Sequence, residues 1–580
     1  MNRYLTAYLC AAAVLCLSLL TPAQAGMIGQ VKNVVPSTIW VSPDGEHVIS
    51  VTVDMKRPGQ KRRVNLDGVL QPGWFDSIAE GTPFFSPDGK HYAFVGVRGT
   101  NCMVVLDGEE QQSYPITATN RLPITGVVFG SDGPRTHLAY QATEKGKHYV
   151  VVNGQRMGGY ESIDKERGLP GIWDFQFIGN SFLYRHKHGG GQRAVLGRID
   201  ERQRNYVTSS KSYNSMRAET PVPMGGKPHK DYGEYIAFVG EKAPGQLQVF
   251  KLPGDTPIDS KMWKEIPGGI LQASPANNGE MAYIAGNTNW VVVVGGKEWP
   301  GCYTTGKLMS SPSGKTWACT AIMKKGKNIV MMVNGVPGKE YAEIQTGKTL
   351  FPAGDERVIF GAATRGGSKT PAHIVVDGKE GKAYTQVRGD SVVFSSDKKA
   401  MAYVAGDGIK DFVVLNGVEG EAFDEVHDVL FAPSRRVMAY RARRGVEHFV
   451  VVGKKAMGPY VNVKPGSLTF RDDGKVVAWS AFGKDGLWHV YANGKPIDAG
   501  CERVISRLTF VPGMAQPAYV GQFVAEGKTF YSMSYGGKLG RAFDSIWLGD
   551  GGKLFVQEDG TIPYFGKSGS LLYRVVAKKK

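Results

Sequence analysis

Short runs of β-branched and aliphatic residues end again and again in Asn-Gly or Asp-Gly. They include VNLDG (64–68), VVLDG (104–108), VVVNG (150–154), MMVNG (331–335) and VVLNG (413–417). Asn-Gly or Asp-Gly between two apolar runs is the strongest short-range signal of a β-hairpin, because these residues tolerate positive φ. The pattern therefore predicts a long series of hairpins.

Two further patterns keep a fixed order with these hairpins. A Ser-Pro-Asp-Gly turn comes first, as in SPDGE (42–46) and SPDGK (86–90), and leads into a strand such as YAFV (92–95), where Ala alternates with large apolar residues. A short strand of one aromatic, two polar and one aliphatic residue follows the hairpin, as in FDSI at both 75–78 and 543–546. Four short strands in about 40 residues are the pattern of one β-propeller blade.

The chain contains 13 such units, counted by their first turns. We therefore expect an all-β fold of tandem β-propellers built from about 13 four-stranded blades. Single propellers typically have four to eight blades, so we expect a first propeller of about six blades at 26–301 and a second of about seven at 302–580. The units near 164–262 are irregular and include an insertion at 205–230. A strand at 27–34 is expected to complete a blade built from the C-terminus, because an open sheet edge invites aggregation.

The segment FSPDGKHYAFVG (85–96) resembles the WD-like repeats of TolB-type bacterial β-propeller proteins. The resemblance covers nearly the whole chain after residue 25, weakly in the irregular units. It implies a periplasmic protein that acts through protein contacts. No segment corresponds to a TolB N-terminal domain, and the Val-Val-Asn-Gly strand is particular to this chain, so partnership in the Tol system does not carry over.

The N-terminus has the layout of a secretory signal peptide. Arg3 precedes an apolar run, which ends in TPAQA with small residues at Ala23 and Ala25. This layout predicts a signal peptide at 1–25, cleaved after Ala25, and a periplasmic or secreted protein. No later stretch is long and apolar enough for a transmembrane helix.

The chain is basic, with a formal net charge of +17. Outside the cytoplasm this charge favours an anionic surface or an acidic protein as partner, and no nucleic acid is expected. Basic residues gather at 56–63, 324–327, 435–444 and 578–580. These clusters are either separate solvated loops or, if the loops of successive blades share one rim, parts of one positive face.

Four cysteines follow the signal, namely Cys102, Cys302, Cys319 and Cys501. Export permits disulfides, and Cys302 and Cys319 are the one near pair, so they are the candidate disulfide. The alternative is that the cysteines are buried free thiols that fill small core positions.

Motifs of enzymatic chemistry are missing from the sequence. No Gly-x-Ser-x-Gly nucleophile elbow occurs, and GKSGS (566–570) does not fit it. His186 and His188 share one face of a predicted strand, but no third metal ligand is spaced nearby. The acidic turns lack the ladder of oxygen ligands that Ca²⁺ requires. We therefore assign no catalytic residue, cofactor or metal.

These observations favour an exported, non-enzymatic β-propeller that binds a protein partner or an anionic envelope component through its loop rims. One alternative is a propeller-mouth enzyme or carbohydrate-binding protein whose site is assembled from several blades. The irregular units near 164–262 are where such a site would distort the repeat. A purely structural envelope protein, which would self-associate, is a third alternative.

Overall fold

The computed structural model describes residues 24–30, 34–54, 58–116, 122–133, 135–160, 172–200, 202–216, 222–223, 236–244, 246–258, 261–266, 270–272, 281–286, 289–325, 327–347, 350–364, 371–548, 552–569 and 571–578. This part of the chain is all-β apart from the short 3-10 helix η2 (Gly389–Ser391). None of its helices is long and apolar enough to cross a membrane.

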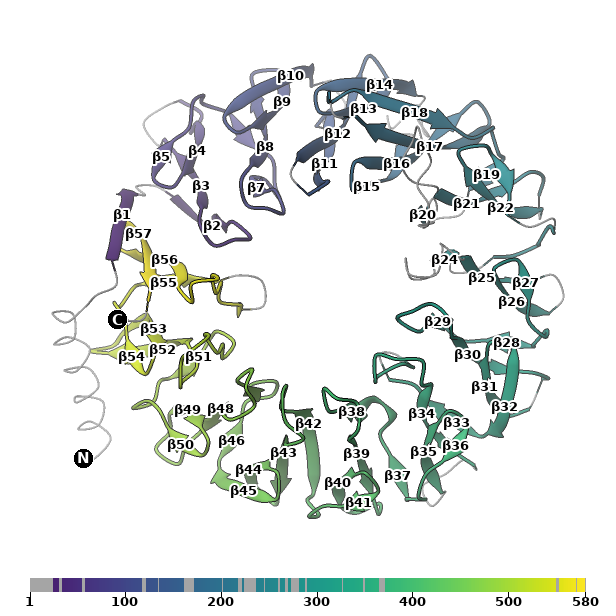
Figure 1. The fold of residues 1–580 in the computed structure, drawn as a ribbon. Coiled ribbons are helices and arrows are strands. Elements are labelled where there is room, and N and C mark those ends of the chain that lie inside the picture. The colour runs from purple at the N-terminus through teal and green to yellow at the C-terminus, as the bar shows by residue number, and fades with distance from the viewer. Residues whose placement is uncertain are drawn as a thin grey trace. The chain divides into compact units, whose positions relative to one another are not determined.

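The described strands form 13 antiparallel sheets of four or five strands each (Figure 1). In twelve of them the order of strands follows the chain, and the last one also takes in β1. The predicted all-β fold and the predicted number of blades are thereby confirmed. In chain order the sheets are β2–β5 (34–70), β6–β10 (77–115), β11–β14 (124–160), β15–β18 (172–209), β19–β23 (215–257), β24–β27 (270–298), β28–β32 (304–341), β33–β36 (343–380), β37–β41 (386–419), β42–β45 (425–460), β46–β50 (462–496), β51–β54 (503–539) and β55–β57 (545–577) with β1.

The Ser-Pro-Asp-Gly turn joins the first and second strands of a blade, and its serine forms part of the fold. In the turn before β8 (Tyr92–Arg98), Ser86 is fully buried. Its Oγ donates to Asp88 Oδ1 at 2.5 Å and accepts from the N–H of His91 at 3.0 Å. Gly89 donates to the Ser86 carbonyl oxygen with a φ of 75°. The repeated motif is thus conformational chemistry of the turn.

The Asn-Gly or Asp-Gly turn joins the third and fourth strands and also ties them to the second. Asn334 has a φ of 46°, its N–H donates to the Trp317 carbonyl at 2.9 Å, and its Oδ1 accepts from the Trp317 N–H at 2.8 Å. The same pair of bonds recurs at Asp67, Asn153, Asp377, Asn416 and Asn493. Asn and Asp combine tolerance of positive φ with a side-chain acceptor, which explains their use here.

Where the structure describes it, the connection to the next sheet runs beside the turn between the second and third strands. Phe423 pairs with Asp411, the first residue of β40 (Asp411–Leu415), and Tyr384 pairs likewise with Ala372 of β35 (Ala372–Val376). We call this end of the strands the connection end of a sheet. The Ser-Pro-Asp-Gly and Asn-Gly turns lie at the other end of the strands, which we call the opposite end.

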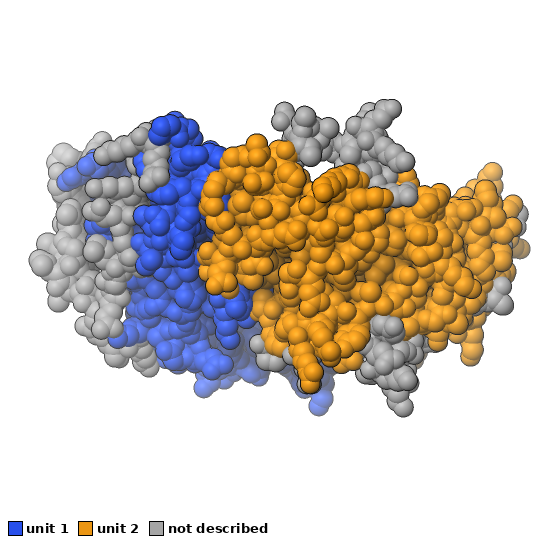
Figure 2. Space-filling model, turned by 90° about the horizontal axis from the view of Figure 1, so that it is seen from above, with its two compact units in different colours: residues 1–94, 391–580 blue, residues 95–390 orange. Residues whose placement is uncertain are grey.

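The chain divides into two compact units, which Figure 2 colours separately: unit 1 is 1–94 with 391–580, and unit 2 is 95–390. The predicted boundary at residue 301 lies inside unit 2. One hydrophobic cluster spans that point, with Val292 before it and Trp317 after it. The structure therefore places no unit boundary there, and the division into a first propeller at 26–301 and a second at 302–580 stays a prediction.

In unit 1 the last sheet contains a strand from the N-terminus. Strand β1 (Gln24–Gln30) pairs antiparallel with β57 (Leu571–Ala577), beside β56 (Ile562–Ser568) and β55 (Ser545–Trp547). The closing strand expected at 27–34 thus has its counterpart at 24–30. Of the predicted signal peptide, only Gln24 and Ala25 are described, and they begin this strand.

Candidate functional site

The region predicted to be irregular contains the sheet β15–β18, whose second and third strands have eight and nine residues. Strands β16 (Ser181–His188) and β17 (Gly191–Ile199) follow β15 (Ile172–Ile178), and β18 (Asn205–Ser209) is the outer strand. Strand β18 is formed by the first residues of the predicted insertion at 205–230. Two of its large side chains are exposed, Tyr206 at 43% and Val207 at 47%.

Strand β18 differs from the other long outer strands among the described residues. Its sequence, NYVTS, has no charge, Pro or Gly, and its register with β17 is uninterrupted. The strands β1, β10 (Glu109–Pro115), β14 (Gln155–Tyr160), β32 (Val336–Tyr341) and β45 (Lys455–Tyr460) each contain a register shift. Bulges, Pro and charges are the usual protection of sheet edges against pairing. The β18 edge lacks all three.

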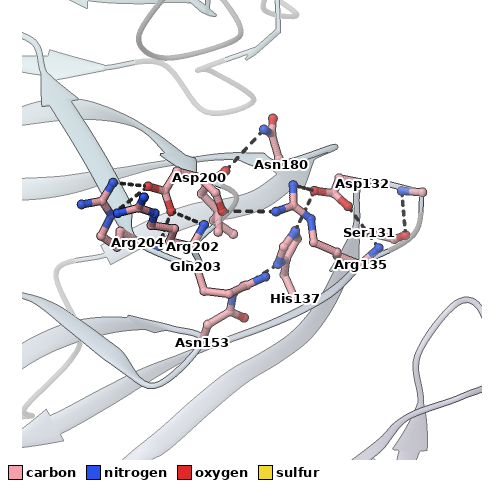
Figure 3. Close-up of polar contacts among 12 residues, drawn as sticks. Ser131, Asp132, Arg135, His137, Asn153, Asn180, Asp200, Arg202, Gln203 and Arg204 are labelled. Atoms are coloured by element: carbon pink, nitrogen blue, oxygen red, sulfur yellow. Dashed lines mark hydrogen bonds and ion pairs between the residues drawn. The ribbon is translucent and has the colours of Figure 1, made fainter.

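The side chain of Asp200 holds the turn between β17 and β18 through hydrogen bonds within the turn. Asp200 Oδ1 accepts from the N–H groups of Arg202 and Arg204, both at 2.8 Å. Its Oδ2 accepts from Arg204 Nε, also at 2.8 Å, and Figure 3 shows the two side chains together. The Arg204 guanidinium lies over the Tyr206 ring at 5.6 Å. Backbone hydrogen bonds from Arg204 and Arg202 and the Arg204 side chain lower the pKa of Asp200.

The neighbouring sheet β11–β14 holds the start of β18. Asn153 Nδ2 donates to Gln203 Oε1 at 2.6 Å (Figure 3). Gln155 Nε2 donates to the Gln203 carbonyl at 2.8 Å, and Gln155 Oε1 accepts from the Asn205 N–H at 3.2 Å. Gln203 has a φ of 62°. These contacts fix where the outer strand begins.

A buried histidine extends this polar cluster. His137 is fully buried, and Asn153 Nδ2 lies 3.1 Å from its Nδ1, while Asp132 Oδ2 lies 3.4 Å from its Nε2. With Asn153 as donor, the ring proton is on Nε2 and faces Asp132. Burial lowers the pKa of His137, so the imidazole is neutral at pH 7. Arg135, which also donates to the Asp200 carbonyl at 3.2 Å, pairs with Asp132 at 2.5 Å. The cluster therefore joins two blades.

The two histidines singled out in the sequence lie on one face of β16. The ring centroids of His186 and His188 are 6.1 Å apart. His186 stacks on Tyr160 at 4.0 Å, and its Nδ1 donates to the Lys187 carbonyl at 2.8 Å. Burial lowers the pKa of His186 to about 4, so it is a neutral packing group at pH 7. Among the described residues, no group of three or more His, Cys, Asp or Glu is arranged to hold a metal ion.

All four described cysteines are buried free thiols. Cys302 occupies the connection position that is aromatic in other blades, where it pairs with Trp290, and Cys501 pairs likewise with Trp488. In both blades a tryptophan on the third strand thus faces a small residue. Cys302 and Cys319 belong to one core cluster, and burial raises the pKa of both thiols. The disulfide between them stays a prediction.

A thiol count decides between this disulfide and the alternative of four free thiols, which the structure favours. We expect four reactive thiols per unfolded chain after export, because the two-blade repetition of the Cys–Trp pair gives Cys302 a packing role that needs no bridge. Two thiols without reductant and four with reductant would instead demonstrate one disulfide.

Exposed lysines gather at the connection ends of the unit 2 sheets. Each lies in or beside a turn between second and third strands: Lys145, Lys147, Lys242, Lys324, Lys325 and Lys327. The described acidic residues of the same turns have partners, since Glu144 pairs with Arg156 and Glu241 accepts from Ser215. At the opposite ends the turns of these sheets include Asp107, Asp132, Asp200, Asp255, Asp355 and Asp377. Basic residues also lie at these opposite ends, because Arg135, Arg204 and Arg357 pair with three of the aspartates. The connection ends are therefore marked by their exposed lysines.

No model of a known protein family matches the chain, and no curated protein matches it. Solved structures similar to it include TolB from Acinetobacter baumannii, with 16% identity, coverage of 50% of this chain and 76% of that chain, and a TM-score of 0.18. The match to the Dos1 propeller has 7% identity, covers 54% of this chain and 88% of the Dos1 chain, and has a TM-score of 0.21. The match to the β-propeller domain of the Trilobed protease from Pyrococcus furiosus has 9% identity, covers 56% of this chain and 93% of that chain, and has a TM-score of 0.20.

TolB, whose repeats the sequence resembles, is therefore among the similar structures. With these identities and TM-scores the similarity concerns β-propellers as a fold and carries no argument about function. The assignment of blades rests on the strand topology of the chain itself.

Proposed function

We propose that the chain is an exported, non-enzymatic binding protein that engages an anionic component of the cell envelope through the connection ends of its unit 2 sheets. The observation that carries the proposal is the group of exposed lysines described above. Six of them lie at the connection ends, in or beside turns whose described acidic residues already have partners.

A group of exposed lysines is a suitable binding surface for a polyanion. Separate lysines contribute little individually in water, but several on one edge create a potential that attracts a multivalent anion. Such attraction weakens with salt, since the Debye length is about 10 Å at 0.1 M ionic strength. The overall charge of +17 acts in the same direction. The predicted signal peptide would place the protein where envelope polyanions occur.

Binding to an acidic polysaccharide and to vesicles with anionic phospholipid tests the proposal. The triple variant K145E/K324E/K325E reverses charge at the connection ends of two sheets. We expect it to weaken binding at least tenfold at low salt, because three attractive contacts become repulsive. The two probes distinguish polymer from lipid as the source of the anionic groups.

The matched control is K297E/K315E/K379E, which changes net charge equally at the opposite ends, where these three lysines are also exposed. We expect it to weaken binding less than threefold. Equal loss in both variants would show that only net charge matters, and binding that does not respond to either variant or to salt would contradict the proposal.

A further inference from the structure

We propose that the outer edge of β18 is a docking site at which an extended acidic segment of a partner protein adds as a fifth strand to the sheet β15–β18. This site is separate from the lysines of the connection ends.

The register of β18 determines which backbone groups face outward. The N–H of Ser210 donates to the carbonyl of Ala194 in β17 at 2.9 Å. Hydrogen-bonding direction alternates along an antiparallel strand, so the backbone groups of Tyr206 and Thr208 also face β17, whereas those of Val207 and Ser209 face away from it. The N–H of Asn205 also faces away and is already bonded to Gln155. Val207 and Ser209 therefore offer two donors and two acceptors at the spacing of a sheet ladder.

The edge is held in place before any partner arrives. Asp200 organises the turn that precedes β18, and Gln155 holds Gln203 and Asn205 from the neighbouring sheet. The Arg204 guanidinium and Asp200 position the Tyr206 ring. A preorganised edge loses little conformational entropy on pairing, which favours binding by strand addition.

The charges at the two ends of β18 indicate which kind of strand can pair with its outer edge. Arg202 precedes the strand and Lys211 follows it, and both are exposed. If two copies of β18 paired antiparallel about Val207, Lys211 of each copy would lie opposite the stretch from Arg202 to Arg204 of the other. Like charges placed opposite one another destabilise a strand pair. Two carboxylates lie at these ends as well: Asp200 pairs with Arg204, and Asp255 accepts from the Lys211 N–H at 3.2 Å. A segment with acidic residues beyond both ends of a short apolar stretch complements the side chains of Arg202 and Lys211.

The test uses four capped ten-residue peptides with a core of alternating Val and Thr. One has Glu at both ends, one has Lys at both ends, and each is paired with a version that has Pro at the centre. We expect saturable binding of the Glu-ended peptide to the full chain. We expect at least tenfold weaker binding of the Lys-ended peptide and of both Pro versions.

Two variants of the protein locate the site. Val207→Pro removes only an outward N–H, so β17 and β18 keep their hydrogen bonds, and Pro is tolerated at edge positions of this kind. We expect it to weaken binding of the Glu-ended peptide at least tenfold with a melting temperature close to that of the wild type. Val207→Thr keeps the N–H and serves as the control, with binding within twofold.

Residue-resolved hydrogen exchange supplies a readout that does not depend on the variants. In the free chain the amides of Val207 and Ser209 should exchange quickly and those of Tyr206 and Thr208 slowly. The bound Glu-ended peptide should slow the first pair.

Three outcomes would overturn the proposal. The first is no saturable binding of the Glu-ended peptide, and the second is equal binding by Val207→Pro and wild type. The third is a concentration-dependent dimer of the chain that Val207→Pro abolishes, which would make a second copy the occupant. The variant K145E/K324E/K325E should bind the peptide normally, so failure of the proposed polyanion binding and failure of this proposal are distinguishable.

Discussion

A chain that begins at residue 31 melts roughly 10 °C below one that begins at residue 24. The difference is expected because β1 forms the outer strand of the last sheet, with pairs from Gln24↔Val576 to Gln30↔Leu571. Each net backbone hydrogen bond contributes about 0.5–1.5 kcal/mol, so loss of the strand costs roughly 3–6 kcal/mol. In a unit of this size, 1 kcal/mol shifts the melting temperature by about 2–4 °C.

Strand β57 transmits this loss to the neighbouring blade of unit 1. Leu572 of β57 is fully buried and packs in one cluster with Phe565 and with Val48 of β3 (Val48–Val53). Arg574 of β57 forms an ion pair with Glu46, in the first turn of that blade. An unpaired β57 therefore loosens the packing between two sheets as well as its own edge.

Addition of a synthetic peptide in trans provides the control. Residues 24–30 supplied as a free peptide should restore much of the lost melting temperature, and a peptide of the same composition in scrambled order should not. An unchanged melt after removal of 24–30 would show that β1 does not stabilise the blade.

His489→Gln removes a pH-dependent stabilisation of unit 1. His489 lies in β49 (Trp488–Ala492), with Nε2 2.8 Å from Asp485 Oδ2 and Nδ1 3.3 Å from Asp498 Oδ1. The interaction with Asp498 first, and then that with Asp485, raises the pKa of His489 from 6.5 to about 9 against the effect of burial. The imidazole is therefore protonated at pH 7 and balances two carboxylates.

The expected effect follows from the direction of this pKa shift. Because the folded pKa lies above the unfolded value, the stabilisation is complete below about pH 6.5 and is lost as the pH rises through about 9. A shift of this size corresponds to roughly 2–3 kcal/mol for a partly buried group. Asp498 keeps its hydrogen bonds from Tyr519 and Val490 in the variant, so the lost term is the charge of the imidazolium.

Urea denaturation from pH 6 to pH 10 measures this effect. The free energy of unfolding should be lower in His489→Gln than in the wild type by roughly 2–3 kcal/mol at pH 6, and the difference should shrink toward pH 10. His188→Gln, which changes an exposed histidine, should show no such trend. A difference that stays constant across the range would mean that packing, and not charge, makes His489 stabilising.

The repeat could be predicted from sequence because its signals are local. Ser86, Asp88 and Gly89 satisfy one another within a single turn, and Asn334 reaches a strand only 17 residues away. Residue types with such short-range roles recur wherever the turn recurs. The number of blades therefore followed from counting turns, although three of the 13, near residues 232, 277 and 550, lie outside the described residues.

The candidate sites depend on neighbours that sequence does not reveal. The insertion at 205–230 was recognisable, but the exposure of Val207 depends on β18 being the outer strand of its sheet among the described strands. One available signal was the uncharged stretch NYVTS between basic residues. The cluster of Asp132, His137 and Gln203 likewise joins residues about 70 positions apart across two sheets, and no linear spacing predicts it.

The central claim, that the connection ends of unit 2 bind an anionic envelope component, is tested most directly by a lysine-modification footprint. The full chain is acetylated with and without bound acidic polysaccharide, and each lysine is quantified by mass spectrometry. We predict that the polymer shields Lys145, Lys147, Lys242, Lys324, Lys325 and Lys327 and leaves Lys297, Lys315 and Lys379 reactive. Equal shielding of both groups, or shielding of the second group alone, would contradict the account.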